Sequence, residues 1–235
     1  MVRSILAFLG IAVVTVAYSV AVMLHMALFR DLDIFFVYAR SWSRWLLRLA
    51  GIRVQLSGSE HVQPGQRYIY VANHASLFDI PVLLATVPDN IRIMYKRELA
   101  SIPVFGWGLR MSPFIAVDRD NSREAAAQIE QAVQSMRMGS SVVVFPEGTR
   151  SADGSLGAFK RGAFTLAARA GRPLVPVALI GTAAIMPART WRLKGGTVQC
   201  MILPAVELPK DMPSRADERR AMEHVHTRIA EHVSA

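Results

Sequence analysis

The chain has 235 residues, which is enough for one domain with a full hydrophobic core. A net charge of +9 and a pI of about 10.4 are high for an enzyme of soluble metabolites and favour an anionic partner, either a membrane surface or a phosphorylated substrate. Nucleic acid fits less well, because the basic residues are dispersed and no nucleic-acid-binding motif occurs. The single cysteine, Cys200, excludes internal disulfides and indicates a reducing compartment, and its apolar surroundings predict a buried side chain.

The amino end of the chain is hydrophobic. No charged residue occurs from Ser4 to Phe29, and as a helix this run would be about 39 Å long, against roughly 30 Å of hydrocarbon in a bilayer. The run is longer than the apolar part of a signal peptide, so we expect a membrane segment. Arginines follow it and place the rest of the chain on the cytoplasmic side of the inner membrane. They are Arg30, Arg40, Arg44, Arg48 and Arg53.

A second helix is predicted at about residues 38–50. Its arginines recur every fourth residue, while Trp42, Trp45, Leu46 and Leu49 form an apolar face. This pattern is typical of a helix lying on anionic lipid. A surface helix with its tryptophans in the core has the same pattern, and so does a hairpin that enters one leaflet without crossing it. We therefore divide the chain into a membrane-anchoring helical segment, 1–50, and an α/β domain, 51–235.

From residue 51 onward, strand and helix patterns alternate, which predicts an α/β fold with a mostly parallel sheet flanked by helices. Strands are expected at 52–56, 67–72, 91–95, 113–117, 141–145, 174–180 and through Cys200. Helices are expected from about 80, over 121–139 and 159–170, and from about 214, with broken helix at 98–110. Because Pro176 lacks an N–H donor, we expect strand 174–180 at a sheet edge or in an irregular position.

Residues 73–79, Asn-His-Ala-Ser-Leu-Phe-Asp, join a predicted strand to a predicted helix. Positions five apart point about 140° apart on a helix, so His74 meets Asp79 only if it precedes the helix and folds back. Ser76 as N-cap would put Asp79 at N3, whereas Pro81 favours a start nearer Asp79. The pair has two interpretations: a helix cap beside an ordinary histidine, or a carboxylate that accepts the Nδ1 proton and leaves Nε2 as a general base.

Polar residues follow other predicted strands too. Lys96, Arg119 and the turn from Glu147 to Arg150 each begin within two residues of the end of one. The carboxyl ends of parallel strands meet at one edge, so we expect a base beside a cationic pocket. Arginine matches phosphate with a planar fork, lysine supplies a mobile point charge, and Gly148 lets the backbone approach a ligand.

Five blocks, in this order, resemble the glycerolipid acyltransferase family and most closely its bacterial 1-acyl-sn-glycerol-3-phosphate acyltransferases. They are the His-x4-Asp block at 73–79, a lysine-containing segment at 96–99, the block at 114–119, Phe-Pro-Glu-Gly-Thr-Arg-Ser at 145–151, and a proline-containing strand at 175–179. The chain departs from the pattern at Ala116-Val117, where many members have a bulkier Phe-Ile pair. That departure bears on the choice of acceptor.

The resemblance implies transfer of a fatty acyl group from acyl-CoA or acyl carrier protein to the sn-2 hydroxyl of lysophosphatidic acid, in phospholipid biosynthesis and without a cofactor. It implies His74 as the base, Asp79 as its orienting group, and a bilayer with anionic headgroups as partner. Substrate contacts are implied for Lys96, Arg119, Glu147, Gly148, Thr149 and Arg150. We expect no metal and no nucleic acid.

Other functions fit parts of the sequence. An acyltransferase for another lysolipid, such as lyso-ornithine lipid or lysophosphatidylethanolamine, would carry the same motifs. A serine hydrolase using Ser76 would need an awkward turn geometry and lacks a Gly-x-Ser-x-Gly elbow. A zinc site of His74, Asp79 and Glu147 would make activity sensitive to chelators. A non-catalytic protein that binds anionic lipid would depend on charge alone.

Overall fold

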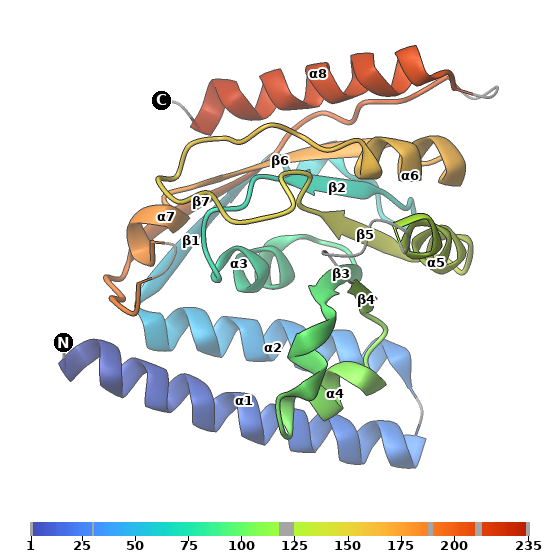
Figure 1. Cartoon of the computed structure of the whole chain (residues 1–235). Helices are drawn as coiled ribbons and strands as arrows, with labels where there is room; N and C mark the ends of the chain where they lie inside the picture. The colour runs from blue at the N-terminus through green and yellow to red at the C-terminus, as the bar shows by residue number, and fades with distance from the viewer. Residues whose placement is uncertain (1, 30, 118–124, 188–189, 210–212, 234–235) are drawn as a thin grey trace.

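The computed structural model describes residues 2–29, 31–117, 125–187, 190–209 and 213–233. Its centre is a seven-stranded sheet in the order β1-β7-β6-β2-β5-β3-β4, with helices on both faces (Figure 1). The strands are β1 (Ile52–Ser57), β2 (Ile69–Ala72), β3 (Ile91–Lys96), β4 (Ile115–Val117), β5 (Ser141–Val144), β6 (Leu174–Ile180) and β7 (Gly196–Ile202).

Neighbouring strands run parallel except for β6 and β7, which are antiparallel. The predicted mostly parallel α/β fold is therefore confirmed. Strands β2 to β6 all point the same way, so their carboxyl ends meet at one edge of the sheet, where open α/β sheets bind ligands. Cys200 lies on β7 and is fully buried, as predicted.

Helices cover the sheet in layers, with α3 and then α2 and α1 on one face and α5, α6 and α8 on the other (Figure 1). The first core contains Tyr70, Leu83 and Val198, and the second contains Phe164 and Val225. The helices are α1 (Val2–Phe29), α2 (Leu32–Ala50), α3 (Asp79–Thr86), α4 (Phe105–Met111), α5 (Ala125–Arg137), α6 (Gly162–Ala170), α7 (Thr182–Ile185) and α8 (Arg215–Val233), with 3-10 turns η1 (Ser59–His61) and η2 (Arg97–Ser101).

The expectation that Pro176 would place its strand at an edge or in an irregular position was wrong. Strand β6 lies inside the sheet, between β7 and β2. The Pro176 carbonyl accepts a hydrogen bond from Leu203 N at 2.9 Å, on the β7 side. The N and O atoms of one strand residue point to the same side of the strand, so the nitrogen of Pro176 also points toward β7. The pairing of β6 with β7 starts only at Val177, so the missing N–H lies at the end of that ladder. The ladder to β2 loses no donor.

Helices α1 and α2 form an antiparallel hairpin. Helix α2 begins six residues before its predicted start, because Asp31 caps it: the Asp31 carboxylate accepts from Asp33 N at 2.9 Å and Ile34 N at 3.4 Å. Along the hairpin, Trp42 Nε1 donates to Thr15 Oγ1 at 3.1 Å, and the hydroxyls of Tyr18 and Ser41 lie 2.6 Å apart. One face of α1 is therefore packed along much of its length.

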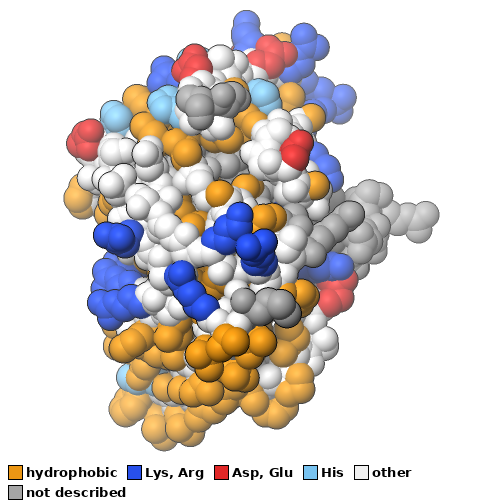
Figure 2. Space-filling view, turned by 90° about the vertical axis from the view of Figure 1, so that its left-hand side faces the viewer, with side chains coloured by type: hydrophobic (Ala, Val, Ile, Leu, Met, Phe, Trp, Pro, Cys, Tyr) orange, Lys and Arg blue, Asp and Glu red, His pale blue; other side chains and the backbone are white. Residues whose placement is uncertain are grey.

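The other face of α1 is apolar and exposed. Within the described residues, α1 is the one helix long and apolar enough to cross a membrane, with a mean hydropathy of 2.5. Its large exposed hydrophobic residues follow a helical spacing, mostly three or four positions apart: Val2, Ile5, Leu6, Leu9, Val13, Val16, Val20, Leu24, Leu28 and Phe29. In Figure 2, hydrophobic side chains gather at the bottom of the molecule, the level of α1 in Figure 1, with Lys and Arg side chains above them.

Candidate active site

The turn between β2 and α3 brings His74 onto Asp79. His74 Nδ1 lies 2.8 Å from Asp79 Oδ2, and the same oxygen accepts from Ala75 N and Ser76 N, each at 2.8 Å. A carboxylate oxygen can only accept, so the shared hydrogen belongs to Nδ1. Helix α3 begins at Asp79 itself, the start that Pro81 favoured over a Ser76 cap.

The imidazole of His74 is held on its face as well as at its edge. The Phe145 ring stacks on it with centroids 4.1 Å apart and planes 20° apart. His74 is 5% exposed and Asp79 is fully buried. No described residue hydrogen-bonds to Nε2, so the fixed ring presents that nitrogen as an available acceptor.

Ser76 cannot act as a nucleophile in this arrangement. It is fully buried, and its hydroxyl donates to Met186 O at 3.1 Å and accepts from Phe78 N at 3.4 Å. Its role is to fix the turn that carries His74. The hydrolase interpretation therefore has no support in the geometry.

Two long-range contacts hold the backbone of the turn. Asn73 Nδ2 donates to Leu179 O at 2.9 Å, and Leu179 N donates to Asn73 Oδ1 at 2.8 Å. The Asn73 amide thus extends the pairing of β2 with β6 beyond the end of β2. On the other side, Ser151 N donates to His74 O at 2.8 Å. His74 is therefore fixed relative to both β6 and the 145–151 segment.

Glu147 is part of the same network. Its Oε1 accepts from His74 N at 2.7 Å and its Oε2 from Gly157 N at 2.9 Å. Burial raises the pKa of Glu147 above the usual glutamate value, although both backbone hydrogen bonds oppose this shift. Protonation of Glu147 would place a carboxyl O–H against a backbone N–H, and both groups are donors. Because the pKa of Glu147 is raised, acid disturbs this arrangement at a higher pH than it would with an exposed glutamate. Glu147 is best described as a backbone acceptor within the described structure.

Glu147→Gln is expected to destabilise the fold by about 1–3 kcal/mol, because one of the two backbone N–H groups would face an amide donor. Urea unfolding of the two proteins measures this difference. Glu223→Gln on α8, where the side chain is 62% exposed, is the control and should change stability by less than about 0.5 kcal/mol. Equal stability of the two variants would mean that the Glu147 hydrogen bonds contribute nothing.

The predicted cationic residues are only partly gathered in the described structure. Arg150 is half-buried, one residue before Ser151, while Thr149 beside it is exposed. Lys96 lies at the end of β3, two strands from β2, and pairs with Glu98 at 2.9 Å. Gly148 has a φ of +76°, which favours glycine. Arg119 lies outside the described residues.

Sequence reasoning missed three supporting groups. Phe145 and Asn73 stood inside the quoted motifs, but their roles need partners that are distant in sequence. Lys160 lies outside those motifs. Its backbone N–H donates to Pro146 O at 2.8 Å. Its ammonium lies over Gly148, so that a Cβ at position 148 would be 2.8 Å from Nζ. The spacing of twelve positions between Gly148 and Lys160 was the signal in the sequence that could have indicated this contact.

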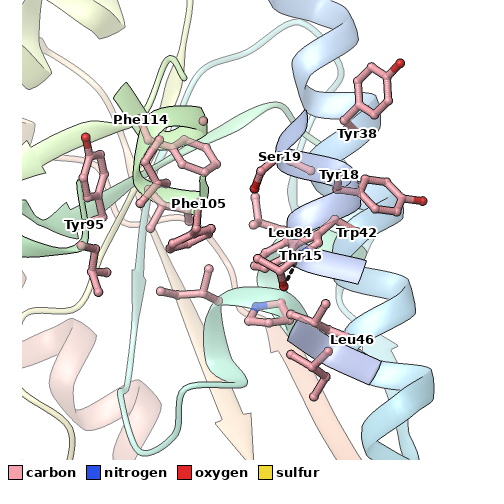
Figure 3. Close-up of a pocket in the computed structure, with 18 of the residues that line it drawn as sticks. Thr15, Tyr18, Ser19, Tyr38, Trp42, Leu46, Leu84, Tyr95, Phe105 and Phe114 are labelled. Carbon is pink, nitrogen blue, oxygen red and sulfur yellow. Dashed lines mark hydrogen bonds between the residues drawn. The ribbon is translucent and has the colours of Figure 1, made fainter. Parts of the chain in front are cut away.

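An apolar cavity of about 360 Å³ lies between the α1–α2 hairpin and the sheet domain. Figure 3 shows Trp42 and Leu46 on one side of it and Tyr95, Phe105 and Phe114 on the other. Its lining includes Leu77 and Phe78, from the turn that carries His74, and Met186, which accepts the Ser76 hydrogen bond. The cavity therefore reaches the segment that holds the candidate base.

Comparison with known proteins shows which family this chain resembles. A family model described as Acyltransferase matches residues 53–180. The 1-acyl-sn-glycerol-3-phosphate acyltransferase of Pseudomonas aeruginosa is 33% identical over 199 residues, which cover 82% of this chain and 76% of that protein. The human alpha enzyme of the same name is 34% identical over 177 residues, covering 73% and 62%.

The chain spans only 34% of the length of a chloroplastic 1-acyl-sn-glycerol-3-phosphate acyltransferase of Brassica napus, to which it is 42% identical over 119 residues. The crystal structure of the 1-acyl-sn-glycerophosphate (LPA) acyltransferase PlsC from Thermotoga maritima has a TM-score of 0.83 and 28% identity, covering 100% of this chain and 95% of that one. Given a family model over more than half of its residues and a bacterial relative matched over most of its length, this chain belongs to the Acyltransferase family.

Proposed function

We propose that the protein transfers a fatty acyl group from acyl-CoA or acyl carrier protein to the sn-2 hydroxyl of lysophosphatidic acid, which yields phosphatidic acid. The observation that carries this proposal is the oriented His74–Asp79 pair, whose Nε2 is available on a turn that also lines an apolar cavity. The names of the similar proteins support lysophosphatidic acid as the acceptor.

In the proposed reaction, His74 Nε2 accepts the proton of the acceptor hydroxyl while its oxygen attacks the thioester carbonyl. General-base assistance of this kind contributes about 10²- to 10⁴-fold in rate. Asp79, 2.8 Å from Nδ1, stabilises the imidazolium that forms. The tetrahedral intermediate then breaks its C–S bond, and the departing thiolate takes the proton back from His74. No acyl-enzyme is needed, because the thioester is already activated.

The acceptor phosphate is assigned to the cationic side chains at the carboxyl edge of the sheet. Arg150 is the strongest candidate, since Ser151 N bonds to His74 O and so fixes the neighbouring residue close to the base. Lys96 and Arg119 complete the proposed set, and the Gly148 backbone lies in the same turn. An arginine fork binds phosphate through two parallel hydrogen bonds.

The apolar cavity is assigned to an acyl chain. Its volume of about 360 Å³ falls within the usual range of ligand pockets, and its lining is almost entirely hydrophobic. A chain held there would leave its carboxyl end near Phe78 and therefore near the His74 turn.

Residues 1–50 are proposed as the membrane anchor and 51–235 as the catalytic domain. Helix α1 packs on α2 and lies against Gly108 of α4 at Ser19, so only its outer face is open to lipid. We infer that the hairpin lies in one leaflet and does not cross the bilayer. The arginines of α2 would then contact anionic headgroups on the cytoplasmic side of the inner membrane.

A panel of lysolipid acceptors, assayed with labelled acyl-CoA and acyl carrier protein, tests the proposal. We expect incorporation into lysophosphatidic acid, and Arg150→Gln should raise KM for it by about tenfold or more, with a smaller effect on kcat. Arg219→Gln, on α8, is the matched control and should change neither value. Acylation of lysophosphatidylethanolamine or lyso-ornithine lipid alone would refute the acceptor.

A further inference from the structure

Trp191 is exposed to an unusual degree. Its side chain is 78% exposed, although tryptophan is usually well buried in a soluble protein. It belongs to the loop between α7 and β7, of which residues 190–195 are called the Trp191 loop below. A single exposed aromatic residue needs no explanation, but one close to an exposed apolar helix adds to a patch of the kind that marks an interaction surface.

The Trp191 loop is held against the amino end of α1. Leu193 N donates to Ser4 Oγ at 3.2 Å, and Ser4 Oγ donates to Leu193 O at 3.3 Å. The Trp191 ring meets the Phe8 ring edge to face, with centroids 5.6 Å apart. Leu193 itself is buried. The position of Trp191 is therefore set by packing, and its exposed ring lies beside the amino end of α1.

Three cations lie in or against the Trp191 loop. Arg192 and Lys194 are exposed neighbours in the loop, and the Arg3 guanidinium lies against Gly195. None of the three pairs with a carboxylate in the part of the chain that the structure describes. The sequence has no acidic residue from 154 to 206. Tryptophan with unpaired cations beside it is the combination found at the boundary between lipid tails and headgroups.

We propose that the Trp191 loop is a second membrane contact, with the Trp191 ring among the headgroups and Arg3, Arg192 and Lys194 on anionic lipid. This inference rests on the proposed membrane placement of α1 but adds a contact from the α/β domain. Figure 2 shows cationic side chains directly above the apolar region of α1. Two contacts fix the rotation of the domain about the α1 axis, and Phe8, which touches Trp191, also lines the apolar cavity. The cavity would therefore face the lipid.

The chain suits a site-specific label. Cys200 is fully buried, and burial raises the pKa of its thiol to about 11, so it reacts poorly. Thr190→Cys would carry an environment-sensitive fluorophore in the loop without removing Trp191. Leu9→Cys, on the exposed face of α1, reports the hairpin, and His224→Cys, on α8 at the opposite side of the sheet, is the control (Figure 1).

The labelled full-length proteins are mixed with phosphatidylglycerol–phosphatidylcholine vesicles, and quenching by iodide is measured. We expect protection at positions 9 and 190 and none at 224. Adding Trp191→Ser should restore quenching at 190 but leave 9 protected. Arg192→Gln with Lys194→Gln should weaken binding to the anionic vesicles, by roughly fivefold for each charge removed.

The outcomes separate the two ideas. Protection at 9 with full quenching at 190 would overturn the Trp191 contact and leave the α1 anchor standing. Quenching at all three positions would overturn the proposed membrane placement and this inference together. Protection at 190 that survives Trp191→Ser would show that the ring does not anchor the loop.

Discussion

Replacing His74 by alanine is expected to lower kcat by about 10²- to 10⁴-fold, the usual contribution of a positioned general base. The fold should survive, because Asp79 Oδ2 keeps its hydrogen bonds from Ala75 N and Ser76 N. Binding of lysophosphatidic acid should also survive, since its phosphate is assigned to other side chains. The measurement is single-turnover acyl transfer beside equilibrium binding of the acceptor.

His226→Ala on α8 is the matched control for that experiment. His226 meets the Phe159 ring at 4.7 Å and lies on the far side of the sheet, so its loss should leave kcat unchanged. Wild-type turnover in His74→Ala would refute the proposed base. Absence of acyl transfer in the wild-type protein itself would favour the alternative of a non-catalytic protein that binds anionic lipid through charge alone.

Two replacements of Asp79 should differ from each other. In Asp79→Asn, the amide oxygen can take the place of Oδ2 and accept the same three N–H groups, while the NH₂ replaces Oδ1, which has no partner in the described structure. The imidazole then keeps its tautomer but loses the negative charge beside it. We expect kcat to fall by about 10- to 150-fold, the equivalent of 1.5–3 kcal/mol for a hydrogen bond to a charged group.

Asp79→Ala removes the acceptor as well as the charge. It leaves two backbone N–H groups buried without a partner and frees the imidazole to rotate, so we expect a larger loss of kcat and a less stable fold. Single-turnover rates beside urea unfolding distinguish the two roles: Asp79→Asn should lose kcat with little loss of stability, whereas Asp79→Ala should lose both. Wild-type kcat in Asp79→Asn would mean that the carboxylate only supports the turn, since the amide oxygen keeps those hydrogen bonds.

The sequence predicted those features that depend on neighbouring residues. The α/β alternation, the start of α3 near Asp79 and the burial of Cys200 follow from local patterns. The place of β6 inside the sheet does not, because strand order is decided by contacts across the whole chain. The early start of α2 could have been read from Asp31, whose carboxylate caps it.

The same division applies to the candidate site. The His74–Asp79 contact spans five residues and could be argued from turn geometry alone. The contacts of Glu147 with His74 and of Asn73 with Leu179 join residues 73 and 106 positions apart. Partners at that separation depend on which strands become neighbours. The start of the helix predicted over 121–139 lies outside the described residues.

The apolar cavity has the α1–α2 hairpin as one wall and the sheet domain as the other, and both Phe8 and Phe78 line it. With α1 lying in a leaflet, an acyl chain can enter this space laterally from the bilayer without passing through water. Turnover should then follow the mole fraction of the lipid substrate in the bilayer. Diluting the vesicles with buffer should leave the rate per enzyme unchanged, whereas diluting the substrate within the vesicles with inert lipid should lower that rate.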